Sequence, residues 1–322
     1  MRFIIFFFLV LSFLFKPSSQ VWAQQKPANT IEISPAYVDV TLNEKGDEKS
    51  FEISITNRTD RKVRVDFSSL DFKQTDPSGA LSFLGKEIGN YTYSLSSFLT
   101  FDNPSLELEK GEVKKLTVTA ENREDLSPGG HYAAVIVRQT PADESEKTII
   151  SPALSSLIYL NKTGGERYNL SFKDISFPNL PLVFSYPPTS IITLQNDGNV
   201  HLTPYGRADI KDIFGRVLYK GIINEGSLRI LPQSRRYIPV YSKKVSWPLP
   251  ISINKISVSG RDSLDKTKFS YEEVFLYINP LFAVSLIVIC ALLVVKKSGI
   301  LRKNKIDTAS KIKVKAKKRK NA

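Results

Sequence analysis

The two histidines, His131 and His201, are the side chains best suited to acid–base or metal chemistry in this sequence. Each lies where a turn meets an apolar run. A metal site needs three or four ligands, and a serine hydrolase needs a nucleophile and an orienting acid beside its histidine. No local pattern supplies these groups, so we predict structural histidines that bond loop carbonyls. The alternative, a hydrolase, requires one histidine to meet a carboxylate and a hydroxyl in one cleft.

Two short motifs copy elements of the penicillin-recognising enzymes, namely Lys162-Thr163-Gly164 and Ser263-Leu264-Asp265-Lys266. Their order along the chain is reversed, the Ser-Asp-Asn element is missing, and no helical domain surrounds them. The single cysteine, Cys290, lies in an apolar run, which excludes an intrachain disulfide and Cys-x-x-Cys metal sites. We therefore predict a protein that is not an enzyme, with no catalytic, cofactor-binding or metal-ligating residues and no cofactor.

The charge of the chain is concentrated at its ends. The 322 residues include 45 Lys and Arg against 32 Asp and Glu, a formal net charge of +13. Two basic residues precede Ala23, and twelve basic residues and one acidic residue follow Val295. The segment between them holds equal numbers of basic and acidic residues and is neutral. This distribution argues against a folded nucleic-acid-binding domain, which would carry the basic excess itself.

The first 23 residues have the pattern of a secretory signal. Arg2 precedes a short apolar run, and Val21-Trp22-Ala23 supplies modest or small residues for cleavage after Ala23. An uncleaved N-terminal anchor is the alternative. An exported chain without disulfides favours a bacterial surface.

A second apolar run, residues 276–295, carries no charge over its length. About 20 apolar residues at 1.5 Å each cross a ~30 Å hydrocarbon core, so we predict a transmembrane helix. Tyr277 is expected near the outer interface, where aromatic residues concentrate. Pro280 suits the first turn of a helix, where an N–H is not needed. A buried core helix is the alternative.

The basic residues that follow fix the orientation. Residues 296–322 should form a disordered cytoplasmic tail against anionic lipid head groups, because basic flanks stay inside. Nucleic-acid binding by this tail is the alternative, although it lacks aromatic residues for stacking on bases. The expected location is thus the cell membrane, with a single span and extracytoplasmic N-terminal domains.

Apolar and polar residues alternate with period two through the exposed middle. Phe51, Ile53 and Ile55 form one such series, and Leu116, Val118 and Ala120 form another. Turn signals rich in Gly, Pro, Asn and Asp separate the series at roughly 8–12 residues, as in β-sandwiches. The fold class is therefore predicted as all-β, with two tandem Ig-like β-sandwich domains followed by one transmembrane α-helix.

Two similar halves are indicated by matched spacing. Ile53-x-Ile55-x-Asn57 matches Ile192-x-Leu194-x-Asn196, and Leu106, Leu108, Leu116 and Val118 recur in spacing as Leu228, Ile230, Ile238 and Val240. We expect domain 1 at residues 24–163 and domain 2 at 164–275. Tyr132–Val137 is expected to be a central strand covered on both faces, and residues 145–160 a further strand pair interrupted by Pro152. The insertion Lys73–Ser94 is either an ordinary long hairpin or a functional loop.

Several runs resemble the WxL-interacting cell-surface proteins of Gram-positive bacteria. The runs in the first half are Ile33–Val40, Gly46, Phe51–Asn57 and Pro128–Tyr132. Those in the second half are Gln195–His201, Asp212–Gly215 and Leu231–Arg236. The order of signal, two sandwiches, span and basic tail is also similar. The resemblance implies a wall-associated adhesion or scaffold role with protein or peptidoglycan ligands.

These observations predict a single-pass bacterial surface protein. Its extracellular sandwiches would bind a cell-wall polymer or another surface protein, with strand addition at a sheet edge as a plausible mode. The alternative is a membrane-tethered chaperone or assembly factor for exported surface or pilus subunits.

Overall fold

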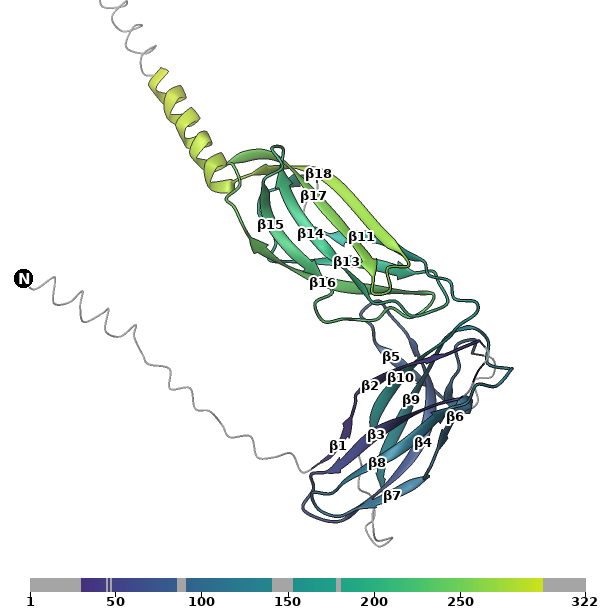
Figure 1. The fold of residues 1–322 in the computed structure, drawn as a ribbon. Coiled ribbons are helices and arrows are strands. Elements are labelled where there is room, and N and C mark those ends of the chain that lie inside the picture. Colours follow the sequence, from purple (N-terminus) through teal and green to yellow (C-terminus); the bar gives the residue numbers. More distant parts are fainter. Residues whose placement is uncertain are drawn as a thin grey trace, which may run out of the picture.

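Alternating apolar residues fold the chain into two β-sandwiches, joined end to end and followed by one helix (Figure 1). The computed structural model describes residues 30–44, 46, 48–85, 91–140, 153–177 and 181–297. The predicted signal peptide, 1–23, and the tail beyond Lys297 lie outside this part of the chain. Within it the fold class is the one predicted, all-β with two Ig-like sandwiches and a C-terminal apolar helix.

Two facing sheets make up the first sandwich. The smaller sheet contains, in spatial order, β1 (Ile31–Ser34), β3 (Lys49–Asn57), β8 (Val113–Ala120) and β6 (Leu99–Phe101). The larger sheet contains β2 (Tyr37–Leu42), β10 (Ala153–Lys162), β9 (Gly129–Thr140) and β4 (Val63–Gln74), and β4 also pairs with β5 (Leu81–Leu84) and β7 (Ser105–Leu108). A short 3-10 turn, η1 (Ser96–Phe98), precedes β6. The segment predicted as a strand pair within 145–160 is described only from Ala153, where it is the single strand β10.

The period-two series point into the core as predicted. Ile53 and Ile55 of β3 and Leu116 and Val118 of β8 are fully buried in one cluster, while the residues between them face water or lie at the surface. Each such burial contributes roughly 1.5–3 kcal/mol. The first core draws on residues 31–160 and the second on residues 170–277, on either side of the expected boundary.

The central strand β9 is buried on both faces, which confirms the prediction for its apolar run. Ala133 and Val135 alternate with Tyr132 and Ala134; the first pair packs into the sandwich core, and the second pair into a separate cluster outside it. β10 and β4 flank β9 along its length. Something must therefore cover the outer face of this sheet.

The second sandwich is one continuous sheet that folds over on itself. Its strands, in spatial order, are β11 (Leu170–Ser176), β13 (Thr189–Asn196), β16 (Ser234–Lys244), β15 (Val217–Ile223), β14 (Pro204–Asp212), β17 (Ile251–Asp262), β18 (Lys268–Ile278) and β12 (Leu182–Val183). Ile192 of β13 and Val258 of β17 lie four strands apart in this order, yet they share one core cluster. The sheet closes around that cluster like a sandwich.

Both sandwiches begin in the same way. β1 pairs antiparallel with β3, and after Pro35 the chain crosses to the other sheet, where β2 runs parallel to β10. In the second sandwich β11 pairs antiparallel with β13, and β12 then runs parallel to β18. A proline suits the crossing point because it has no N–H to leave unpaired at the strand end.

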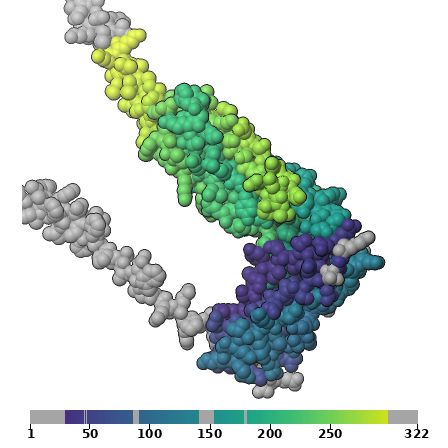
Figure 2. Space-filling model, viewed as in Figure 1, coloured from purple at the N-terminus to yellow at the C-terminus, as the bar shows by residue number. Residues whose placement is uncertain are grey.

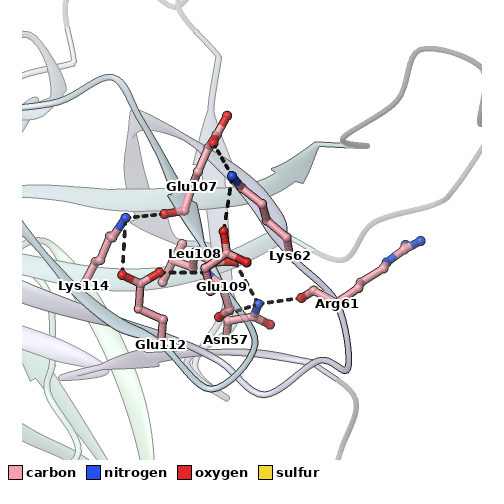
Figure 3. A network of polar contacts seen from close by, with 8 residues as sticks. All are labelled: Asn57, Arg61, Lys62, Glu107, Leu108, Glu109, Glu112 and Lys114. Carbon is pink, nitrogen blue, oxygen red and sulfur yellow. Dashed lines mark hydrogen bonds and ion pairs between the residues drawn. The ribbon is translucent and has the colours of Figure 1, made fainter.

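The repeated Asn57 and Asn196 hold equivalent turns. The Nδ2 of Asn57 donates to the carbonyls of Arg61 at 2.8 Å and Leu108 at 3.0 Å (Figure 3). The Nδ2 of Asn196 likewise donates to Val200 O at 2.7 Å and Ile230 O at 3.0 Å. Leu108 and Ile230 are positions that the matched spacing had already paired. The internal similarity of the two halves therefore extends to individual hydrogen bonds.

The C-terminal helix, Pro280–Lys297, begins four residues later than predicted. Residues 276–278 complete β18, because they pair with residues 251–253 of β17. Tyr277 is buried in the second core, so its predicted place at a membrane interface is wrong. The helix carries no charged residue before Lys296, and none of it is buried against the described residues, consistent with a membrane span (Figure 2).

Candidate functional site

An aromatic cluster covers the outer face of the larger sheet of the first sandwich. Phe72, Tyr132 and Tyr159 come from three adjacent strands, and their ring centroids lie 5.6–5.9 Å apart. Leu231, from the loop between β15 and β16 of the second sandwich, is buried in the same cluster. The cover that β9 requires on this face thus includes a side chain of the other domain.

Arg229, in the same loop, binds the first sandwich by charge and by stacking. Its Nη2 donates to Asp39 Oδ2 at 2.6 Å, and its guanidinium carbon lies 4.0 Å from the ring centroid of Tyr37 and 4.6 Å from that of Tyr159. The side chain of Arg229 is only 16% exposed. Burial acts to raise the pKa of Asp39, but the bond to His201 and the charge of Arg229 outweigh it and lower that pKa below its ordinary value.

His201 lies at this junction rather than on a loop carbonyl. Its Nε2 is 3.6 Å from Asp39 Oδ1, and its Nδ1 is 3.5 Å from Tyr132 Oη. A histidine, a carboxylate and a hydroxyl therefore do meet, as a hydrolase would require. The Tyr132 side chain is fully buried, so a substrate cannot reach its hydroxyl, and burial raises the pKa of that hydroxyl well above its ordinary value. Asp39 is also engaged by Arg229, and we interpret the group as a contact between domains.

His131 fits the prediction of a structural histidine. It is buried, its Nδ1 lies 2.9 Å from Ser94 O and its Nε2 lies 2.8 Å from Ser127 O. Burial lowers its pKa, against the opposing effect of the two carbonyls. His131 thereby ties two loops of the first sandwich together.

Main-chain atoms bring the two domains into close contact beside the cluster. The Gly130 amide donates to Asn199 O at 2.8 Å. A methyl group on Gly130 would overlap Tyr132 Oη and lie 3.2 Å from Asn199 O, so glycine is required for this approach. Asn199 is held in turn, since its Oδ1 accepts from the Arg167 amide at 2.6 Å.

The tip of the β4–β5 hairpin, residues 74–80, adds a second contact. The Tyr237 amide of β16 donates to Pro77 O at 2.7 Å, and the Gln74 side chain donates to Arg235 O. The guanidinium of Arg236 fills the space where a Cβ of Gly79 would lie. The start of the Lys73–Ser94 insertion is thus a contact with the second domain; its residues 86–90 lie outside the described part of the chain.

The junction collects runs that are far apart in the sequence. Pro128–Tyr132, Gln195–His201 and Leu231–Arg236 all contribute, and a cleft of about 380 Å³ opens beside Asp39, His201 and Arg229. Within the described residues, no group of three or more His, Cys, Asp or Glu side chains is placed to hold a metal ion. The arrangement fixes two sandwiches against each other through an ion pair, stacked rings and main-chain bonds.

No family model matches the chain, and no curated protein does, so the resemblance to WxL-interacting proteins stays a prediction. Some solved structures are similar to the chain over nearly all of their own length, at low sequence identity and TM-score. The class 5 fimbriae chaperone CfaA is 13% identical, with 76% of this chain and 99% of that chain covered at a TM-score of 0.38. The CsuC–CsuE chaperone–tip adhesion subunit complex of Acinetobacter baumannii is also 13% identical, with coverages of 78% and 99% and a TM-score of 0.37. PapD-like domain 7 of human CEP192 is 17% identical, with coverages of 47% and 99% and a TM-score of 0.31. At these values the chain is similar to these proteins in fold alone.

Proposed function

We propose that the chain is a non-enzymatic, single-pass membrane protein whose first sandwich binds an extended segment of another exported protein. The observation that carries this proposal is an open strand edge. β10 pairs with β9 along its whole length, but with β2 only from Leu157 onward. Among the described residues, Ala153–Ser156 have no strand on that side. Unpaired backbone at a sheet edge is a template for strand addition.

Apolar side chains lie beside this edge. Leu154 of β10, Ile33 of β1 and Val38 of β2 are partly buried and pack against the first core. β1 is itself the last strand of the smaller sheet, so among the described residues no strand covers the edge of either sheet where the chain crosses at Pro35. A partner strand would gain main-chain hydrogen bonds from the edge and apolar contacts from these side chains. A protein segment satisfies both requirements better than a sugar polymer does.

Charge supports the expected topology. The C-terminal helix ends at Lys296 and Lys297, and the sequence beyond remains basic, as is typical of a cytoplasmic flank. Both sandwiches would then lie outside the membrane, where exported proteins pass. The contacts at the junction join the first sandwich to the domain that carries the anchor.

Ser155 offers a direct test of the edge. The Leu157 amide donates to Ala36 O, toward β2, so the amide of Ser155, two residues earlier, points to the same open side. Ser155→Pro removes that donor without removing a bond to β9, and Ser155→Ala keeps it. The full chain in lipid nanodiscs should capture an exported protein, the alanine variant should capture it equally, and the proline variant should lose it. Equal capture by the proline variant, or capture of purified wall polymer alone, would contradict the proposal.

The folding state of the captured protein distinguishes a scaffold from a chaperone. A scaffold holds a folded partner, and the complex persists when that partner is native. A chaperone or assembly factor holds a subunit before it folds, so the full chain should suppress aggregation of the denatured partner and release it on folding. Refolding the captured protein with and without the chain, followed by light scattering, distinguishes these outcomes.

A further inference from the structure

The end of the second sandwich that carries the helix exposes apolar side chains on two loops. The helix leaves this sandwich at the end away from the first one (Figure 1). The β14–β15 turn presents Ile213 and Phe214, which are 66% and 76% exposed, and the β16–β17 loop presents Trp247 and Leu249, which are 79% and 45% exposed. Such large apolar side chains at one end of a domain mark an interaction surface.

Both loops lie at the level of the helix start. Asp212, which begins the turn, pairs with Asn254 near the start of β17, and Ile251 at that start pairs with Ile278. The Asn279 amide donates to Pro250 O at 2.7 Å, and its Oδ1 accepts from the Leu281 amide at 2.9 Å. Asn279 therefore caps the helix and fixes the β16–β17 loop to its first turn.

The length of the apolar stretch draws this end of the domain to the bilayer. Pro280–Val295 spans about 24 Å at 1.5 Å per residue, which is less than the ~30 Å of a hydrocarbon core. Lys296 and Lys297 hold the other end at the opposite surface. A single residue, Asn279, separates β18 from the helix, so no linker lifts the domain away. The polar head groups must then reach the loops.

The depth of the apolar surface matches the head-group region. That region is about 5–8 Å thick on each side of the core. Ile251 and Ile253 both face outward from β17, and they are about 7 Å apart along the strand. Lys255, about 7 Å further along β17, forms an ion pair with Glu272 at 3.0 Å. The apolar surface therefore ends between Ile253 and Lys255. The loops at the opposite end, residues 197–199, 225–228 and 263–267, expose one large apolar side chain, Leu264.

We propose that the helix-bearing end of the second sandwich is a lipid-contacting surface, in which Trp247, Leu249, Ile213 and Phe214 sit among the head groups. The inference rests on the proposed membrane anchorage. It adds that the second sandwich itself contacts the bilayer surface. The occupant is a phospholipid surface, because the surface is continuous with the span. Tryptophan is the residue most typical of that depth.

The intrinsic fluorescence of Trp247 tests this directly. The sequence has two tryptophans, and Trp22 lies in the predicted signal, so Trp22→Phe makes Trp247 the sole emitter in any preparation. In nanodiscs of phosphatidylcholine and phosphatidylglycerol, Trp247 should emit at shorter wavelength than a solvated indole. It should lose emission when the acyl chains are brominated near the head group. The matched control carries Trp247→Phe and Leu264→Trp, and its emission should be unchanged by bromine.

Two further measurements keep the outcomes separate. Loops 213–216 and 245–250 should exchange amide hydrogens more slowly in nanodiscs than in detergent, a readout that needs no substitution. Carbonate extraction of membranes reports the anchor alone. If Trp247 emits at long wavelength without quenching while the chain resists carbonate extraction, the lipid contact is refuted and the membrane anchor is supported. Release by carbonate would overturn both. Equal partner capture by Ser155→Pro, with the quenching of Trp247 retained, would contradict the proposed strand edge and still support the lipid contact.

Discussion

Removing Arg229 should loosen the junction between the two sandwiches. Its ion pair with the half-exposed Asp39 contributes about 0.5–1 kcal/mol, the usual range for a pair open to solvent on one side. Its stacking on Tyr37 and Tyr159 contributes about 1 kcal/mol more, because the guanidinium is largely buried. Arg229→Ala should therefore weaken the contact by about 2 kcal/mol, which raises the population of the open junction about 30-fold.

Amide hydrogen exchange of the full chain in nanodiscs measures this opening. The amides of Gly130 and Tyr237 donate across the junction and should exchange about 30-fold faster in the variant. The matched control is Arg58→Ala, which removes an ion pair with Glu32 whose two side chains are each 54% exposed. It should change these rates about two-fold or less, since such pairs contribute about 0.5 kcal/mol. If Arg229→Ala changes them no more than the control does, the energetic role assigned to the junction is refuted.

Three other outcomes follow from the junction and the repeated turns. Gly130→Ala should separate the domains, because the added methyl group overlaps Tyr132 Oη in the junction cluster and crowds Asn199 O, and a wider distance between spin labels would report this. Gly226→Ala, with open space around it, should leave that distance unchanged. Because the pKa of Asp39 is lowered at the junction, the ionised carboxylate stabilises the domain contact fully above about pH 4, and this stabilisation is lost as the pH falls further. The same spin labels should therefore move apart only in acid. In the Asp39→Asn variant their distance should not depend on pH. Asn57→Ala should cost about 2–4 kcal/mol of first-domain stability in urea unfolding, because buried carbonyls lose their donor; a loss below about 1 kcal/mol would contradict this.

The strands were predictable because their signal is local. Period-two alternation marked β3 and β8, and the unbroken apolar run of β9 correctly indicated cover on both faces. Nothing in the sequence said that the cover would come from Leu231, a loop residue about 100 positions further on. The spacing of Asn57 and Asn196 did identify equivalent turns, since each side chain serves its own loop.

The domain junction and the helix start were missed for a related reason. Arg229 stands in a polar loop, and only the folded chain brings it to Asp39 on β2. Tyr277 lies between two apolar residues, so the apolar run predicted that it belongs to the transmembrane helix. In the structure it pairs with β17 as part of β18 instead. Pro280 was the usable signal, since a helix can begin at proline but cannot continue through it from the strand before.

The continuous ladder between β17 and β18 also has a mechanical consequence. Tension on the C-terminal helix enters β18 at Ile278, at the helix-bearing end, while a load on the first sandwich pulls from the opposite end. The force then runs along the strands, so the hydrogen bonds at eleven paired positions are sheared together instead of being opened one after another. The second sandwich is thereby built to bear tension between the C-terminal helix and the first sandwich, and its rate of forced unfolding sets how long that load is carried.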